Sequence, residues 1–226
     1  MRICIPITAA TTAEALIKME EGFGLADFLE LRIDGIRKVN LEKLLTVRKG
    51  KLLVTNRVKE EGGAFNGGER ERVALLTKAV ALGSDYVDLE IRTKKNLINK
   101  LKKAVETAQG QTRLILSYHN LERTPRLTEL REKMEEGQRG GADIIKIVPF
   151  AEKMEDNLKV LALIPFARKR GLEIITFCMG ASGKISRIMA PLLGSYLSYA
   201  SLSQGEESAP GQLTVREMKE VFRILK

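Results

Sequence analysis

The apolar run Gly141-Ala142-Asp143-Ile144-Ile145-Lys146-Ile147-Val148-Pro149 contains a single lysine. A short apolar run between glycine and proline breakers predicts a buried strand. Burying an ammonium without a counter-charge is costly, so Lys146 either reaches water from a strand end or stands in a pocket as an amine. A neutral amine in a dry pocket attacks carbonyls and forms Schiff bases. The rest of the chain bears on this choice.

Similar apolar runs alternate with amphipathic stretches along the whole chain. This alternation, without a change in composition, predicts a parallel α/β fold in a single domain, residues 1–226. A count of eight strand–helix units favours a (β/α)₈ TIM barrel over an open sheet. The expected strands are Arg2–Ile7, Phe28–Ile33, Leu52–Asn56, Tyr86–Ile91, Arg113–Tyr118, Asp143–Val148, Glu173–Cys178 and Tyr196–Ala200. The expected helices are Thr12–Gly22, a weak one at Asn40–Val47, Glu69–Leu82, Lys95–Thr107, Leu127–Arg139, Met154–Arg170, Ile185–Leu193 and Leu213–Leu225.

Charged and apolar side chains alternate within the expected strands. Glu30, Arg32 and Asp34 share one face of the second strand, and Asp88 and Glu90 share one face of the fourth. Because helices cover the outside of a parallel barrel, these charges are expected inside it, near the carboxyl ends of the strands. An antiparallel sheet with one wet face alternates in the same way, but its hairpins need no helices between the strands.

The composition fits one well-buried domain and limits the class of protein. The chain has 226 residues, 44% of them hydrophobic, which is enough for a barrel-sized core. No apolar run is long enough to cross a bilayer, and the apolar start Met1–Pro6 is too short for a signal peptide. Cys4 and Cys178 lie far apart in apolar runs and indicate reduced thiols, so a cytoplasmic location is expected. With two cysteines and one histidine, no metal site is expected.

A formal net charge of +9 suggests an anionic partner. Much of the excess lies at residues 94–103, where Leu97, Ile98 and Leu101 share one helical face and the lysines share the solvated one. No basic cluster is interleaved with aromatic residues, and an aromatic content of 5% offers few platforms for stacking bases. A nucleic-acid partner is therefore not expected.

Polar residues gather where the middle strands end. Arg57 and Glu61 follow the third strand and lead into a glycine-rich segment, for which a phosphate cradle is a weak alternative because the Walker spacing is missing. His119, the only histidine, follows the fifth strand, and Lys146 lies in the sixth. Consecutive barrel strands are neighbours, so imidazole and amine are expected to meet the same small molecule. A structural role for His119 is the alternative.

Two loops follow the last two strands. The first, Met179-Gly180-Ala181-Ser182-Gly183-Lys184-Ile185-Ser186-Arg187, leads into a helix, and the second contains Ser208-Ala209-Pro210-Gly211-Gln212. These two loops of a barrel commonly bind anionic groups, and an arginine can hold a carboxylate through two parallel hydrogen bonds. The alternatives are a surface arginine and a plain linker.

Together these residues resemble the type I 3-dehydroquinate dehydratases, the Schiff-base enzymes of the shikimate pathway. The resemblance covers essentially the whole chain and rests on seven motifs in the same order. They are Glu-x-Arg-x-Asp, Arg-x-x-x-Glu-Gly-Gly, Asp-x-Glu, Ser-Tyr-His, Asp-x-x-Lys-Ile, Met-Gly-x-x-Gly-x-x-Ser-Arg and Ser-Ala-Pro-Gly-Gln.

The resemblance implies that 3-dehydroquinate is dehydrated to 3-dehydroshikimate through an imine on Lys146, with His119 as general acid and base and Glu61 orienting it. It implies substrate-binding roles for Glu30, Arg32, Arg57, Arg187, Ser208 and Gln212. It implies residues that support or line the site at Asp34, Asp88, Glu90, Met179 and Tyr199. The family needs neither cofactor nor metal, and its members are often homodimers in the cytoplasm.

Two features depart from the family pattern. Longer members begin with a hairpin that covers the barrel floor, whereas the first strand here starts at Arg2, so the floor must be closed in some other way, of which side chains alone are one. The loop Ser203-Gln204-Gly205-Glu206-Glu207-Ser208 is slightly longer and more acidic than in relatives, which bears on its closure over an anionic substrate.

Two other functions fit parts of the pattern. The nearer is another Schiff-base barrel lyase, such as an aldolase acting on a sugar phosphate, but Ser-Ala-Pro-Gly-Gln offers few free backbone amides for a phosphate. The other is a non-catalytic, basic, anion-binding barrel, whose mark would be steeply salt-dependent binding to polyanions. The sequence alone leaves open the oligomeric state and the choice between biosynthesis and quinate breakdown.

Overall fold

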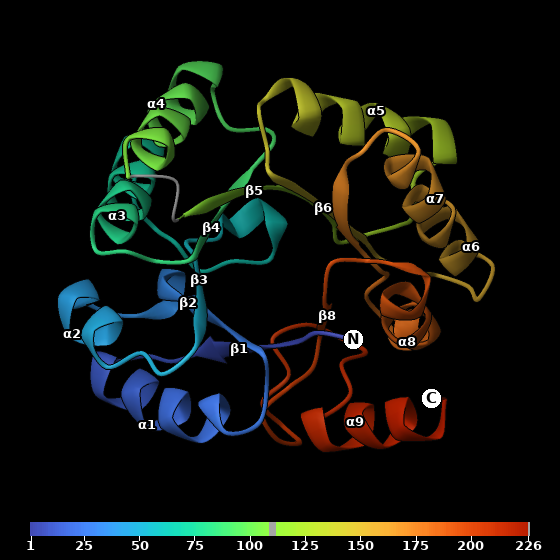
Figure 1. The fold of residues 1–226 in the computed structure, drawn as a ribbon, viewed down its shortest axis with the longest axis horizontal. Helices are drawn as coiled ribbons and strands as arrows, with labels where there is room; N and C mark the ends of the chain where they lie inside the picture. Colours follow the sequence, from blue (N-terminus) through green and yellow to red (C-terminus); the bar gives the residue numbers. More distant parts are fainter. Residues whose placement is uncertain (109–111, 226) are drawn as a thin grey trace.

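Eight parallel strands form a nearly closed barrel with helices around it (Figure 1). The computed structural model of the protein describes residues 1–108 and 112–225. The strands are hydrogen-bonded in the order β7-β6-β5-β4-β3-β2-β1-β8, so each strand lies beside its neighbour in the sequence and β8 returns to β1. The expected (β/α)₈ barrel is confirmed.

The elements follow the expected alternation closely. The strands are β1 Ile3–Thr8, β2 Phe28–Arg32, β3 Lys51–Thr55, β4 Tyr86–Glu90, β5 Arg113–Asn120, β6 Ile144–Pro149, β7 Glu173–Thr176 and β8 Ser198–Tyr199. The helices are α1 Thr12–Phe23, α2 Leu41–Thr46, α3 Glu69–Ala81, α4 Lys95–Thr107, α5 Leu127–Arg139, α6 Asp156–Leu161, α7 Leu163–Arg168, α8 Lys184–Leu193 and α9 Val215–Ile224. The weak second helix is present, and Asn40 caps it by accepting the backbone N–H of Lys43.

One expected helix is divided. Instead of a continuous helix over Met154–Arg170, α6 and α7 meet at Ala162. Pro165 lies in the first turn of α7, and its nitrogen has no hydrogen to donate to the carbonyl of Leu161 four residues earlier. The first turn of a new helix tolerates this loss, whereas the interior of a long helix does not.

The barrel closes at its weakest seam between β7 and β8. The expected strand Tyr196–Ala200 is reduced to Ser198–Tyr199, which pairs with β1. On the other side, the backbone N–H of Tyr196 donates to the carbonyl oxygen of Ile174 at 2.7 Å, and that of Thr176 donates to Ser195 Oγ at 3.2 Å. A serine hydroxyl therefore replaces part of the strand ladder here.

Side-chain alternation divides the core into two layers. On β2, Leu29 and Leu31 pack outward in the cluster that the helices cover, whereas Phe28 packs inside the barrel. Glu30 has the same parity as Phe28 and is buried. On β6, Lys146 likewise has the parity of the inward-facing Ile144. The inward direction expected for the charged faces is confirmed.

Aromatic side chains fill the barrel at the amino ends of the strands. Phe28, Tyr86 and Tyr196 have ring centroids 5.5–6.1 Å apart, and the Tyr86 and Tyr196 hydroxyls are 2.7 Å apart. The guanidinium carbons of Arg2 and Arg113 lie 4.5 and 5.3 Å from the centroid of the Tyr196 ring. Side chains thus fill the barrel floor, and the open end is the one where the strands finish.

Candidate active site

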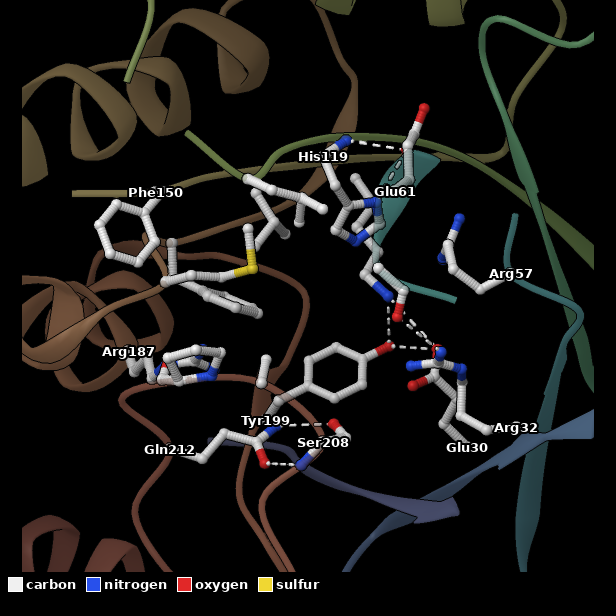
Figure 2. Close-up of a pocket in the computed structure, with 18 residues that line it drawn as sticks. Glu30, Arg32, Arg57, Glu61, His119, Phe150, Arg187, Tyr199, Ser208 and Gln212 are labelled. Atoms are coloured by element: carbon white, nitrogen blue, oxygen red, sulfur yellow. Dashed lines mark hydrogen bonds and ion pairs between the residues drawn. The ribbon is translucent and has the colours of Figure 1, made fainter. Parts of the chain in front are cut away.

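A cavity of about 350 Å³ lies at the carboxyl ends of the strands. Of the predicted site residues, it is lined by Glu30, Arg32, Arg57, Glu61, His119, Lys146, Met179, Arg187, Tyr199, Ser208 and Gln212. The remaining three, Asp34, Asp88 and Glu90, contact lining residues from behind. Eleven positions from across the chain therefore share one cavity, which Figure 2 shows in close-up.

Lys146 is buried, and its ammonium meets three oxygen atoms. Nζ lies 3.0 Å from Tyr199 Oη, 3.2 Å from Asp88 Oδ2 and 3.3 Å from Glu30 Oε1. The two carboxylates supply the counter-charge that burial of an ammonium requires. Lys146 does not reach water from a strand end; its amine is held inside the barrel beside the cavity.

A network of buried charges supports this arrangement. Arg57 Nη2 lies 2.8 Å from Asp88 Oδ1, and Arg57 Nη1 donates to Glu90 Oε1 at 2.9 Å and to Ser117 Oγ at 2.7 Å. Although burial opposes ionisation of Asp88, the charges of Arg57 and Lys146 hold its pKa well below the usual range. Asp88 therefore stays ionised and joins the arginine to the lysine.

Glu61 lies in the short turn Lys59–Glu61 and contacts His119 twice. Its Oε2 accepts the backbone N–H of His119 at 2.9 Å and lies 3.0 Å from the ring Nδ1. Burial raises the pKa of Glu61 to about 7, and burial together with the charges of Arg57 and Lys146 lowers the pKa of His119 well below its usual range. A neutral imidazole whose Nδ1–H donates to the carboxylate leaves Nε2 free to accept a proton.

Arg187, on α8, is a buried cation with spare donors. Its Nε and Nη1 have no hydrogen-bond partner among residues 1–108 and 112–225, and Nη2 donates only to the carbonyl oxygen of Pro210, at 3.4 Å. The guanidinium carbon lies 4.5 Å from the ring centroid of Phe177. Burial lowers the pKa of Arg187 to about 10, which still leaves it charged near neutral pH. Such a group is suited to receive an anion.

The loop after β8 lies over the cavity beside Arg187. Ser208 and Gln212 bond each other: the backbone N–H of Ser208 donates to Gln212 Oε1 at 2.9 Å, and Gln212 Nε2 donates to Ser208 Oγ at 3.1 Å (Figure 2). The backbone N–H of Gly180 donates to the carbonyl oxygen of Pro210 at 3.0 Å, which joins this loop to the one after β7.

Arg32 and Asp34 hold the neighbouring loop. Arg32 Nε and Nη2 each donate to Asp34 at 2.8 Å, and Asp34 accepts the backbone N–H of Ala64 at 3.0 Å and of Arg57 at 3.3 Å. Asp34 thus fixes the glycine-rich segment that carries Glu61, while Arg32 remains at the cavity wall.

Sequence reasoning missed two contributors to the charge network. Ser117 Oγ donates to Asp88 Oδ1 at 2.6 Å, and Arg72 on α3 forms an ion pair with Glu90. Arg72 lies on the buried side of its helix with Val73 and Leu76. A charge at an apolar position of an amphipathic helix was the available signal, because it implies a buried partner.

No group of three or more His, Cys, Asp or Glu side chains among residues 1–108 and 112–225 is arranged to hold a metal ion. No helix in this part of the chain is both long and apolar enough to cross a membrane.

Polar and charged side chains that converge at the carboxyl ends of the strands define an enzyme of the (β/α)₈-barrel class. A family model described as type I 3-dehydroquinase matches residues 3–226. The chain belongs to the type I 3-dehydroquinase family. The enzyme class expected from the sequence is thus confirmed.

Individual relatives agree with this assignment. The 3-dehydroquinate dehydratase of Desulfotalea psychrophila is 37% identical over 221 residues, covering 98% of this chain and 96% of that protein. The structure of the Aquifex aeolicus enzyme of the same name has a TM-score of 0.82 at 32% identity and covers 99% of this chain and 98% of that one. A Clostridium difficile type I 3-dehydroquinate dehydratase, solved with covalently modified comenic acid, has a TM-score of 0.90 at 25% identity, covering 99% and 91%.

Proposed function

We propose that the protein eliminates water from 3-dehydroquinate to give 3-dehydroshikimate, through an imine on Lys146. The observation that carries the proposal is one cavity that holds a buried amine, a histidine paired with a carboxylate, and an arginine with unused donors. The substrate has a ketone, a neighbouring methylene, and a next carbon that carries a hydroxyl and a carboxylate. Each of these groups finds a chemical counterpart in the cavity.

The amine and the imidazole divide the work. The Lys146 amine adds to the ketone carbon, and loss of water gives a protonated imine that withdraws electrons from the adjacent carbon. His119 then removes a proton from that carbon, which forms an enamine, and returns the proton to the departing hydroxyl. Water finally hydrolyses the conjugated imine, which frees the product ketone and the amine.

The surrounding charges bind and orient the substrate. Arg187 receives the substrate carboxylate through its two unused donors, with Ser208 and Gln212 closing over it. Glu30, Arg32 and Arg57 lie on the opposite side of the cavity from Arg187, toward the substrate hydroxyls (Figure 2). Glu61 keeps the Nδ1–H tautomer of His119, so that Nε2 faces the proton to be moved.

Several further properties belong to the same proposal. The imine supplies the electron sink, so the reaction needs neither cofactor nor metal. Residues 1–226 act as one catalytic domain, of which 109–111 and 226 lie outside the described part. A cytoplasmic location is supported by the buried, unpaired thiols of Cys4 and Cys178. A homodimer is expected from the family resemblance and is tested by light scattering; a monomeric mass would refute it.

Borohydride trapping tests the reaction directly. Reduction in the presence of 3-dehydroquinate should fix an adduct on Lys146, detected by intact mass and mapped by peptide mass. Lys146→Ala should show none, while Lys78→Ala, which removes an exposed lysine on α3, should behave as wild type. An adduct with a sugar phosphate instead would identify an aldolase, and an adduct on another lysine would refute the assigned mechanism.

A further inference from the structure

The hydroxyl of Tyr199 forms a closed triangle with the reactive amine and one carboxylate. Tyr199 Oη donates to Glu30 Oε1 at 3.3 Å (Figure 2). The same Oη lies 3.0 Å from Lys146 Nζ, and Nζ itself lies 3.3 Å from Glu30 Oε1. An aromatic ring would suffice to line a pocket. The hydroxyl adds a contact with the atom that must react.

The amine must lose a proton before it can attack a ketone. An ammonium has three N–H groups, and here they face Tyr199, Glu30 and Asp88. Asp88 is a poor destination for the proton, because Arg57 and Ser117 also bond it and its pKa is held well below the usual range. That leaves the carboxylate of Glu30.

The carboxylate of Glu30 is more available to the proton than that of Asp88. Its Oε1 accepts hydrogen bonds from Thr55 at 2.8 Å, from Tyr199 and from Lys146, and no arginine bonds it within the described part of the chain. Of the two routes from Nζ to this carboxylate, the one through Tyr199 has the shorter first step, 3.0 Å against 3.3 Å.

We propose that the Tyr199 hydroxyl relays a proton from Lys146 to Glu30 when the imine forms, and returns it when the imine is hydrolysed. In the forward step Nζ gives a proton to Oη while Oη gives its own to Glu30 Oε1. Lysine becomes a neutral amine, glutamate becomes a neutral acid, and tyrosine ends as it began. The freed lone pair on Nζ then adds to the substrate ketone. This inference rests on the proposed imine mechanism.

The surroundings of Tyr199 favour a concerted exchange over a phenolate. Burial, followed by the negative charge of Glu30, raises the pKa of Tyr199 well above its usual value. The phenol therefore holds one proton throughout and can pass one on only while accepting another. The Lys146 Nζ also lies 4.4 Å from the centroid of the Tyr199 ring, which stabilises the cation before transfer.

The test is Tyr199→Phe, which keeps the ring and removes only the hydroxyl. Adduct formation is followed by mixing enzyme with 3-dehydroquinate and quenching with borohydride at successive times. The variant should form the same adduct about 100-fold more slowly, the lower end of the 10²–10⁴-fold that a positioned proton-transfer group contributes. The difference in the rate of adduct formation between Tyr199→Phe and wild type should decrease as pH rises, because hydroxide then removes the proton from the amine in place of the relay. The matched control is Tyr196→Phe, which removes a hydrogen-bonded hydroxyl at the barrel floor and should form adduct at the wild-type rate.

The outcomes distinguish failure of the relay from failure of the imine mechanism. An adduct rate in Tyr199→Phe within about twofold of wild type, at every pH, overturns the relay and leaves the imine mechanism standing. Equal slowing in Tyr196→Phe also overturns it, because the effect would then follow from general loosening of the barrel. If Tyr199→Phe does not fold, Glu30→Gln tests the other end of the relay and should slow adduct formation likewise. Absence of any adduct in the wild type refutes the proposed function and the relay with it.

Discussion

Oε2 of Glu61 binds both the backbone N–H and the ring Nδ1 of His119, at 2.9 and 3.0 Å. One carboxylate oxygen therefore fixes the strand end and the imidazole tautomer together. Glu61 is buried, and 10% of the His119 side chain is exposed. The pKa of Glu61 is raised to about 7, while that of His119 is lowered. At neutral pH the imidazole is an uncharged base, and the state of Glu61 decides how well it is oriented.

The first prediction concerns the pH dependence of turnover. As pH falls through about 7, Glu61 gains a proton and ceases to accept from Nδ1–H, so kcat/KM should fall with an apparent pKa near 7. Glu61→Gln has no carboxylate to titrate and should show a low, flat profile in this range. Steady-state kinetics from pH 5 to 9 check this, and an unchanged acid limb in Glu61→Gln would assign the titration to another group.

Glu61→Gln, which should lower activity, should raise the stability of the fold at alkaline pH. Because the pKa of Glu61 is raised on folding, its contribution to stability is full below about 4.5, the unfolded value, and is lost as pH rises through about 7. Glu61→Gln should therefore match wild type near pH 4.5 and gain at pH 8, by at most about 3 kcal/mol. Urea unfolding at the two pH values measures the difference, and Glu60→Gln, at the exposed neighbouring position, is the control.

The second prediction concerns the cost of removing the buried cation. Lys146→Met leaves Glu30 with only the hydroxyls of Thr55 and Tyr199, whereas Asp88 keeps Arg57. The free energy of unfolding should fall by about 3 kcal/mol at pH 8, since a buried carboxylate loses its partner. Adding Glu30→Gln should restore most of this loss, as urea unfolding of the double variant would reveal. An equal loss in the double variant would mean that packing, rather than charge, is responsible.

The third prediction exploits the unused donors of Arg187. A buried guanidinium with two unpaired nitrogens destabilises the free protein, so Arg187→Met should raise the unfolding free energy by about 1–2 kcal/mol. The same variant should lose the stabilisation that 3-dehydroshikimate gives to wild type. Arg187→Lys keeps a charge without the two-pronged geometry and should raise KM strongly.

Thermal unfolding with and without 3-dehydroshikimate checks the Arg187 variants, beside Arg223→Met on the exposed face of α9 as control. Wild-type KM in both Arg187→Met and Arg187→Lys would remove this residue from the substrate site.

The barrel and the direction of its charges were predictable because they depend on local patterns. Alternation in β2 and β4 places Glu30 and Asp88 inside whatever the exact register, and the lone His119 follows the strand next to the one carrying Lys146. The contacts themselves were not predictable. Glu30, Asp88 and Tyr199 converge on Lys146 from three other strands, and this depends on the stagger of the closed barrel.

Other features depended on exceptions to local rules. The division between α6 and α7 follows from Pro165, which a hydrophobic periodicity does not register. The shortness of β8 follows from closure of the seam by Ser195, a side chain acting in place of backbone. The role of Arg72 was readable in principle from its place among apolar residues, but its partner Glu90 was not.

The fourth prediction concerns the acidic loop after β8. Lys18 Nζ on α1 lies 3.0 Å from Glu206 and 3.1 Å from Glu14, so the loop is tied to the first helix. An ion pair in partial contact with solvent is weak, and Glu206→Gln should raise KM by at most about fivefold at low ionic strength. The difference should vanish at about 0.5 M salt. The matched control is Glu207→Gln, because the Glu207 carboxylate accepts the backbone N–H of Gly205 inside the loop and does not bond α1 in the described part of the chain; it should leave KM unchanged. A salt-independent rise would point to loop folding instead of docking.

The last prediction separates covalent capture from proton transfer at His119. His119 pairs across β5 and β6 with Val148, two residues beyond Lys146, so imidazole and amine stand at successive levels of the same cavity. If the imidazole moves the proton and the amine forms the bond, His119→Ala should still be trapped by borohydride, while turnover falls by about 10²–10⁴-fold. Release of the product from Lys146 also needs proton transfers. His119→Ala should therefore accumulate the covalent adduct in the steady state instead of returning to free enzyme. Stopped-flow turnover and adduct mass, measured on the same samples, decide the matter. Near-normal turnover in His119→Ala would leave this residue a structural one and move the search for the base to Glu61 or Glu30, whose carboxylates line the same cavity.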